Sequence, residues 1–291
     1  MEQGVLVSCL EAKTLEEALG IAARIGYRNG EISVCPDEEY LNLAALREEA
    51  RQQVMDRARE LGMKISSVQC HIHNGYADPD PRVRADAVDH SRRMIDLCGR
   101  WGIPVCHTVS GAAEDEAPWE EKLDRVAESL RKILDHAKGG PVKVALEPVF
   151  IYVIGNLGHT RALLERLEQR EDFLINFDPS HFPYHDEPAE DFILALGKRI
   201  VHAHTKDAVV RPVTDKEQPD GKDRFAMPGD RYFRFMPPAE GDLDWDSVVG
   251  TLRQAGFDGV LSLEMGHSYE APPNDVAKAV YDFFRTKHGI L

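Results

Sequence analysis

The sequence predicts an α/β fold, specifically a single (β/α)8 TIM barrel. Short apolar runs suited to strands alternate with longer stretches of helical periodicity, an order that favours a parallel sheet with crossover helices. The unit repeats about eight times, and a chain of 291 residues suits one large barrel or two smaller domains. A doubly wound sheet is the rival fold, but no GxGxxG motif follows the first strand. We therefore expect one barrel domain over residues 1–291.

Eight strand candidates occur in order, and each is followed by a helical stretch. The candidates are residues 5–10, 30–34, 64–70, 105–109, 142–147, 173–178, 200–204 and 260–264. Capping residues with acidic first turns mark helix starts at Thr14 and Asp244. Left-handed helix ends are expected where glycines precede strands, at Gly26, Gly62, Gly102 and Gly256.

Residues 208–241 interrupt this alternation. The segment is rich in Pro, Gly, Asp and Arg, and its aromatic residues include Phe225, Tyr232, Phe233 and Phe235. It is too long for an ordinary connection, and in a barrel it would follow strand seven on the mouth side. We interpret it as an insertion that forms a lid or substrate loop, with a disordered insertion as the alternative.

The charge balance argues against a nucleic-acid partner. The chain has 35 basic and 50 acidic residues, for a net charge of −15, whereas phosphate-backbone binding needs clustered Lys and Arg. No stretch approaches the roughly 20 apolar residues that span a bilayer, and the start at Met1 lacks a basic segment followed by an apolar export core. We expect a soluble, cytoplasmic protein without a membrane partner, and the sequence leaves a homo-oligomer open.

Four of the predicted strands end in a carboxylate or an imidazole. These residues are Glu147, Asp178, His204 and Glu264. In a barrel the carboxyl ends of the strands converge on one mouth, so residues far apart in the chain can surround a single point. Three carboxylates and one imidazole suit one divalent ion, Mn²⁺, Mg²⁺ or Co²⁺, with Zn²⁺ as a further option.

Each of these residues has a structural alternative. A single acidic residue at a strand end often caps a helix or joins a salt bridge at the barrel mouth. Four together are different, because burying so much negative charge is costly without a cation or several basic partners. Lys206 is the only obvious basic residue nearby in the sequence.

Motifs in the second half of the chain resemble a known superfamily. They are LEP at 146–148, FDPSH at 177–181, HAHTKD at 202–207 and GFDGVLSLE at 256–264. The sequence is similar to the xylose isomerase-like sugar phosphate isomerase/epimerase barrels, which include ketose 3-epimerases, hydroxypyruvate isomerase and inosose dehydratase. The resemblance implies the same four metal ligands and places His181 beside the substrate.

The chain also departs from this pattern. Ketose 3-epimerases of this type often have a second Glu six residues after the first metal Glu, and here that position is Val153. Arg211 aligns loosely with a basic residue that contacts the substrate in the epimerases. Together with the long aromatic segment, the missing Glu favours a substrate bulkier than a simple pentose or hexose.

Further histidines lie in the predicted fourth and seventh strands and directly after the third. His73 and His107 are expected at the mouth, as substrate contacts or as structural residues. In endonuclease IV, a related barrel, corresponding strands supply histidine ligands to a three-metal cluster, so a hydrolase of that kind is a minor alternative. His202 has the same parity as His204 and is expected to form hydrogen bonds deeper in the barrel.

The predicted function is a metal-dependent isomerase or epimerase of a small carbohydrate, a keto-sugar or related polyol. The ion polarises a bound carbonyl, so that loss of the neighbouring proton gives an enediolate. Glu147 and Glu264 would exchange that proton, and His181 and Lys206 would support charge on oxygen. Alternatives are a lyase, as a dehydratase or eliminase of a keto-sugar, inosose or 3-keto-glycoside, and a noncatalytic binding subunit.

Overall fold

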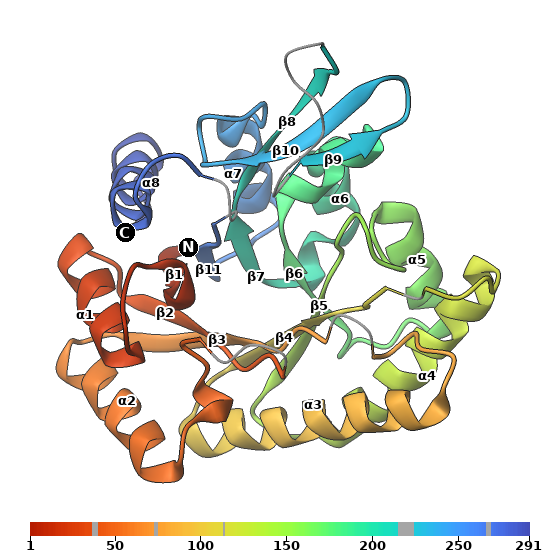
Figure 1. Cartoon of the computed structure of the whole chain (residues 1–291), viewed down its shortest axis with the longest axis horizontal. Coiled ribbons are helices and arrows are strands. Elements are labelled where there is room, and N and C mark those ends of the chain that lie inside the picture. The colour runs from red at the N-terminus through yellow and green to blue at the C-terminus, as the bar shows by residue number, and fades with distance from the viewer. Residues whose placement is uncertain (37–39, 73–74, 113, 215–223, 266–268) are drawn as a thin grey trace.

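Eight parallel strands close into a barrel in this computed structural model, which describes residues 1–36, 40–72, 75–112, 114–214, 224–265 and 269–291. Their order around the barrel is β1-β11-β7-β6-β5-β4-β3-β2 (Figure 1). The strands are β1 (Glu2–Leu6), β2 (Asn29–Ser33), β3 (Lys64–Gln69), β4 (Val105–Val109), β5 (Lys143–Glu147), β6 (Leu174–Phe177), β7 (Ile200–Thr205) and β11 (Val260–Leu263). The predicted (β/α)8 fold class is confirmed.

Helices surround the barrel on its outer side (Figure 1). They are α1 (Leu15–Ile25), α2 (Glu48–Glu60), α3 (Pro81–Trp101), α4 (Trp119–Ala137), α5 (Leu157–Arg166), α6 (Ala189–Leu196), α7 (Trp245–Gln254) and α8 (Pro273–His288). The Thr14 side chain accepts a hydrogen bond from Glu17 N, and Asp244 accepts from Asp246 N and Ser247 N, so both predicted caps are present. Within the described ranges, no helix combines the length and apolarity that crossing a membrane requires.

The first strand begins earlier than residues 5–10, the range predicted from its apolar run. The first residues of β1, Glu2 and Gln3, are polar. Gln3 Nε2 donates to Ile290 O at 2.7 Å, and this hydrogen bond fixes the start of the strand against the end of the chain. Gly4 lets β1 approach β11 closely, since a Cβ there would lie 2.6 Å from Val260 Cγ1. The chain then leaves the sheet in a 3-10 turn, η1 (Val7–Cys9). Hydrophobicity alone therefore misplaced this strand.

The interior of the barrel is unusually polar near the carboxyl ends of its strands. Glu31, Ser67, His107, Asn176 and His202 are all buried, whereas branched apolar residues dominate the interior of most barrels of this class. The apolar core lies mainly between the strands and the surrounding helices. Polar side chains thus form a layer beneath the carboxyl ends of the strands.

The 208–241 segment contains most of a small second sheet. Its strands are β8 (Asp207–Pro212), β9 (Arg224–Met227) and β10 (Arg231–Met236), paired antiparallel in the order β8-β10-β9. Figure 1 shows this sheet at the top of the view, beyond the barrel strands. Phe225 and Phe233 pack on Phe150, with ring centroids 4.9 and 4.8 Å away. Residues 215–223 of the segment lie outside the described residues.

The small sheet is attached to the barrel through Asp207, the buried first residue of β8, two positions after the end of β7. Its Oδ2 accepts hydrogen bonds from Trp245 Nε1 at 2.9 Å and from Ala239 N at 3.2 Å, while its Oδ1 accepts from Leu243 N at 3.1 Å. A single carboxylate thus fixes both ends of the inserted segment.

Candidate metal centre

The four predicted ligands meet at one point of the barrel mouth. Glu147 ends β5, Asp178 directly follows β6, His204 lies in β7 and Glu264 directly follows β11. One ligand atom from each residue lies within 4.8 Å of the ligand atoms of the other three. The strands are neighbours in the order β11, β7, β6, β5, so Glu264 and Glu147 come from the two ends of this arc.

His204 lies among the three carboxylates. Its Nδ1 is 3.2 Å from Glu264 Oε2, 3.5 Å from Glu147 Oε1 and 3.8 Å from Asp178 Oδ2. Burial would lower the pKa of His204, but Glu264, Glu147 and Glu31 outweigh this effect and raise the pKa well above its ordinary value. The pocket is therefore strongly attractive to positive charge.

Lys206 supplies part of that positive charge. Its Nζ lies 2.5 Å from Glu264 Oε2 and 2.9 Å from Asp178 Oδ2, in a side chain that is only 7% exposed. Burial would lower the pKa of Lys206, but Asp178, Glu264 and Glu147 raise it well above its usual range. One ammonium leaves two of the three carboxylate charges to be balanced, which a divalent ion can do. The donor set and its charge therefore fit such an ion.

Glu147 is surrounded by polar side chains from β6, from the 3-10 segment after β6 and from the segment after β3. Asn176 Nδ2 donates to its Oε2 at 2.8 Å, His181 Nε2 lies 3.3 Å from Oε1, and His71 Nε2 lies 3.4 Å from Oε2. Burial would raise the pKa of Glu147, but His204, His181 and His71 together hold it well below its usual range. Glu147 is therefore an ionised carboxylate in a fixed position.

Glu264 is also held on both oxygens. Gln69 Nε2 donates to Oε1 at 2.8 Å, and Lys206 Nζ donates to Oε2. Burial would raise its pKa, but Lys206 and His204 hold the pKa well below the ordinary value. At 15% side-chain exposure, Glu264 is the most accessible of the four residues, so it faces the opening of the mouth.

His181 faces both the centre and the small sheet. It is the third residue of the 3-10 segment η3 (Pro179–His185) that follows Asp178, and its ring contacts Phe150 and Phe235 at centroid distances of 5.6 Å each. Among the described residues, its buried Nδ1 has no hydrogen-bond partner. Phe235 of β10 also lies 4.6 Å from Lys206 Nζ. The small sheet therefore reaches the side chains at the mouth.

The remaining predicted substrate contacts have different locations. His107 is fully buried and hydrogen-bonded to Glu31, and its Nδ1 is 3.8 Å from Glu147 Oε2. It pairs with Ala145, two residues before Glu147, and so lies deeper than a mouth position. Arg211 is exposed and paired with Asp242 at 2.5 Å. His73 lies outside the described residues. Contact between these three residues and a substrate stays a prediction.

Several polar residues around the centre escaped the sequence analysis. Glu31, Gln69 and Asn176 all support the predicted ligands. Glu31 and Asn176 lie inside their strands, and Gln69 ends β3 without belonging to a recognisable motif. Asn176 could have been found, because it has the same inward parity as Asp178. His202 forms the expected hydrogen bonds inside the barrel, to Asn176 Oδ1 at 2.8 Å and Ser67 Oγ at 3.0 Å.

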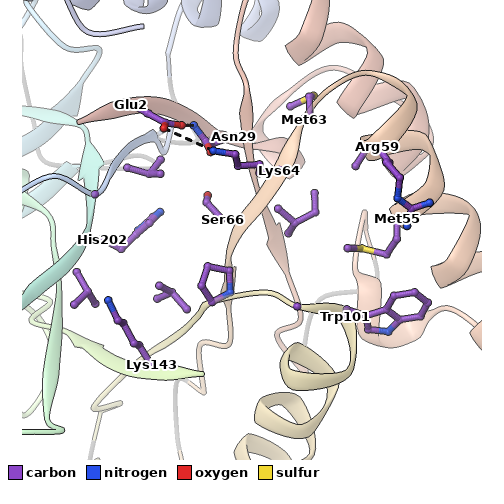
Figure 2. Close-up of a pocket in the computed structure, with 18 of the residues that line it drawn as sticks. Glu2, Asn29, Met55, Arg59, Met63, Lys64, Ser66, Trp101, Lys143 and His202 are labelled. Carbon is purple, nitrogen blue, oxygen red and sulfur yellow. Dashed lines mark hydrogen bonds and ion pairs between the residues drawn. The ribbon is translucent and has the colours of Figure 1, made fainter. Parts of the chain in front are cut away.

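A separate hollow of about 550 Å³ lies at the opposite end of the barrel. Figure 2 shows Glu2, Asn29, Lys64 and Lys143, which come from the first residues of four strands, around this space. Catalytic groups in this fold sit at the carboxyl ends of the strands. The hollow is therefore distinct from the candidate metal centre.

The fold agrees with what comparison with known proteins finds. L-Ribulose-5-phosphate 3-epimerase UlaE of Salmonella paratyphi C (strain RKS4594) is 25% identical over 272 residues, covering 90% of this chain and 86% of that protein. The crystal structure of the IOLI protein with a zinc atom has a TM-score of 0.77 and 18% identity, covering 98% of this chain and 97% of that one.

A sugar epimerase is also among the similar solved structures. D-psicose 3-epimerase from Clostridium cellulolyticum H10, solved with D-tagatose, has a TM-score of 0.74 and 15% identity, covering 98% of this chain and 99% of that one. A family model described as a xylose isomerase-like TIM barrel matches residues 19–287. The chain therefore belongs to the xylose isomerase-like TIM barrel family.

Proposed function

We propose that this protein is a divalent-metal-dependent isomerase or epimerase of a keto-sugar or related polyol. The observation that carries the proposal is the convergence of three carboxylates and one imidazole within 4.8 Å at the barrel mouth. The similarity of this chain to L-ribulose-5-phosphate 3-epimerase UlaE supports a reaction of this class.

Glu147, Asp178, His204 and Glu264 would hold the ion. Their mostly oxygen donor set suits Mn²⁺, Mg²⁺ or Co²⁺, and the zinc atom in the IOLI structure makes Zn²⁺ a further candidate. A bound divalent ion supplies Lewis-acid polarisation of a substrate carbonyl and so acidifies the adjacent C–H bond.

Glu147 and Glu264 are the proposed proton-exchanging pair. Both carboxylates are ionised, and they come from the two ends of the four-strand arc, so a sugar carbon between them would have a base on each side. Epimerisation uses both faces of that carbon, whereas aldose-ketose isomerisation uses one. Asn176 and Gln69 hold the two carboxylates in position by donating to them.

Lys206 and His181 would support negative charge that develops on the substrate's oxygens. The ammonium of Lys206 is kept charged by Asp178 and Glu264, and the buried Nδ1 atom of His181 has no hydrogen-bond partner among the described residues. Proton loss next to a carbonyl gives an enediolate, which these two donors would stabilise.

The small sheet would cover the mouth and select the substrate. Phe235 contacts both His181 and Lys206, so an apolar ring lies directly beside the two groups proposed to support charge on the substrate. Val153, at the position of the missing second Glu, is buried with its carbonyl accepting from Trp119 Nε1 at 2.9 Å. Both features favour a bulkier substrate with an apolar portion.

The same features support a second candidate, a metal-dependent lyase. An enediolate can expel a group from its β carbon, and an apolar cover over the site suits a keto-sugar, inosose or 3-keto-glycoside that carries a leaving group. Release of that group, measured with the same substrate panel, would distinguish elimination from isomerisation.

The test is solvent deuterium exchange during turnover of a keto-sugar panel in D2O. We expect deuterium at the carbon next to the carbonyl, loss of the exchange on chelation, and strong suppression in Glu264→Gln at matched metal content. Glu165→Gln, an exposed carboxylate on α5, is the matched control and should exchange as the parent does. Product without solvent deuterium would point to a hydride shift or hydrolysis and would overturn the proposal.

A further inference from the structure

Glu31 is a buried carboxylate inside the barrel, outside the proposed ligand set. It lies in β2, where the whole strand is buried, and its own side chain is 0% exposed. All of its ion-pair partners among the described residues are imidazoles, those of His107, His202 and His204. A buried carboxylate is costly to maintain, so its contacts indicate what it does.

One oxygen of Glu31 is shared by two histidine rings. Glu31 Oε1 is hydrogen-bonded to His107 Nε2 and lies 3.2 Å from His204 Nε2. A carboxylate oxygen can accept from two N–H groups, whereas a single carboxyl proton could satisfy only one ring. Both Nε2 atoms therefore carry hydrogens that point at Glu31.

This arrangement determines which nitrogen of His204 faces the candidate centre. With hydrogen held on Nε2, Nδ1 is the atom that can offer a lone pair, and it is Nδ1 that lies 3.2 to 3.8 Å from the three carboxylates. His107 is oriented in the same way, since its Nδ1 lies 3.3 Å from the amide nitrogen of Asn176. That amide also donates to Glu147, so the network ends on a second proposed ligand.

We propose that Glu31 is a positioning residue, which holds His204 through Nε2 so that Nδ1 stands at the ligand position. The inference rests on the proposed divalent-ion centre and deepens it. A carboxylate behind a metal-binding histidine fixes the orientation and the tautomer of the ring and makes it a better ligand.

A second ion bound by Glu31 itself is the competing explanation. Glu31, His107, His202 and His204 also bring ligand atoms within 4.8 Å of one another. Both ring nitrogens of His202, however, already have partners, Asn176 Oδ1 at 2.8 Å and Ser67 Oγ at 3.0 Å. Glu31 Oε1 also holds two rings, so hydrogen bonds already occupy that oxygen and both nitrogens of His202; among the described residues, only Oε2 of Glu31 lacks a hydrogen-bond partner in this group.

The test compares Co²⁺ binding by the parent chain and three variants, Glu31→Gln, Glu31→Asp and Ser67→Ala. Competition with a chelator gives the Kd and the number of ions per chain. The Co²⁺-shifted NMR signal of the His204 Nε2 proton reports its hydrogen bond through its rate of exchange with solvent. Ser67→Ala is the matched control, because it removes a buried hydrogen bond of the same layer without touching His204.

We expect one ion per chain in the parent, with slow exchange of the Nε2 proton. Glu31→Gln should weaken Co²⁺ binding about 10- to 100-fold and speed the exchange, while Ser67→Ala should stay within about threefold of the parent. Glu31→Asp keeps the charge but withdraws it from His204, so it should also weaken binding. Melting by circular dichroism checks folding, and Glu31→Asp decides the question if Glu31→Gln does not fold.

Each other outcome has a definite meaning. Equal Kd values for the parent and Glu31→Gln would overturn the role of Glu31 and leave the proposed function standing. Binding of Co²⁺ by Glu31→Asp as tight as in the parent would show that charge alone matters. A parent that binds two ions, one of which is lost in Glu31→Gln, would make Glu31 a ligand. Either result overturns the inference. A parent chain that binds no Co²⁺ would overturn both proposals.

Discussion

Replacing Lys206 with methionine removes the ammonium that bridges Asp178 and Glu264. At distances of 2.5 to 2.9 Å and an effective dielectric constant of about 20, each ion pair is worth about 6 kcal/mol in Coulomb energy. Desolvation of the buried lysine offsets much of this gain, and removing one partner of a buried pair typically costs about 3–5 kcal/mol. At about 2 °C per kcal/mol for a chain of this size, the melting temperature should fall by roughly 6–10 °C.

Thermal melting in a chelator, with and without Mn²⁺ added back, measures this effect. The ion should recover part of the loss, because it neutralises the same carboxylates. Lys132→Met is the matched control, since Lys132 pairs with Glu128 at 2.7 Å on the surface, where solvent screening limits the pair to about 1 kcal/mol or less. A Lys206→Met chain that melts within about 2 °C of the parent in chelator would refute the reasoning.

The stability difference between Lys206→Met and the parent should also depend on pH. Lys206 and His204 lower the pKa of Glu264 against the effect of burial, so this group stabilises the parent above its unfolded pKa of about 4.5, and that contribution is lost as the pH falls. Without Lys206 the folded pKa of Glu264 rises, and the charged form no longer stabilises the fold. The gap should therefore be largest near neutral pH and narrow on acidification.

Three further results are expected. The affinity for the ion should rise with pH, because Glu264 and Glu147 outweigh burial and raise the pKa of His204 above its ordinary 6.5. Binding should therefore release about one proton, which calorimetry in buffers of different ionisation enthalpy measures. An affinity that does not change with pH would contradict this. Phe235→Ala should raise KM about tenfold, because Phe235 contacts His181. Phe225 belongs to the same aromatic cluster but has no ring contact to His181, so Phe225→Ala should change KM less. Equal effects of the two substitutions would make the sheet a passive cover. Asp207→Asn should lower the free energy of unfolding by about 1–3 kcal/mol, because an amide NH2 would face hydrogen-bond donors that the carboxylate now accepts from. Denaturant titrations measure this change. An unchanged unfolding midpoint would exclude Asp207 as the attachment point.

The barrel could be predicted because its elements alternate with clear periods. Helix starts at Thr14 and Asp244 were recognisable, since capping is local chemistry. The first strand was misplaced because its partners are distant in sequence: Glu2 and Gln3 become strand residues through pairing with β11 and contact with the chain end. Local hydrophobicity cannot report such a partner.

The small sheet shows a similar limit. The aromatic residues of 208–241 indicated contact with the mouth, but the segment was expected as a lid or loop rather than as three paired strands. Its strands are held by pairing between β8 and β10 and by Phe150 from another part of the barrel. Whether this sheet selects the substrate stays a prediction.

The convergence of the four proposed ligands was predictable from strand ends, whereas the depth of other residues was not. Glu147 and Glu264 lie where carboxyl ends converge, a property of the fold itself. His107 was expected at the mouth but lies beneath Glu147, and Glu31 was not singled out at all. Their positions depend on the stagger of strands across the barrel, which sequence spacing does not encode.

The central claim is that one divalent ion is held by the four strand-end residues. Anomalous diffraction at the manganese edge, from crystals grown with Mn²⁺, tests it most directly. The account predicts one strong peak at about 2.0 to 2.6 Å from ligand atoms of Glu147, Asp178, His204 and Glu264. Absence of a peak there at saturating Mn²⁺, or a peak among Glu31, His107 and His202 instead, would contradict it.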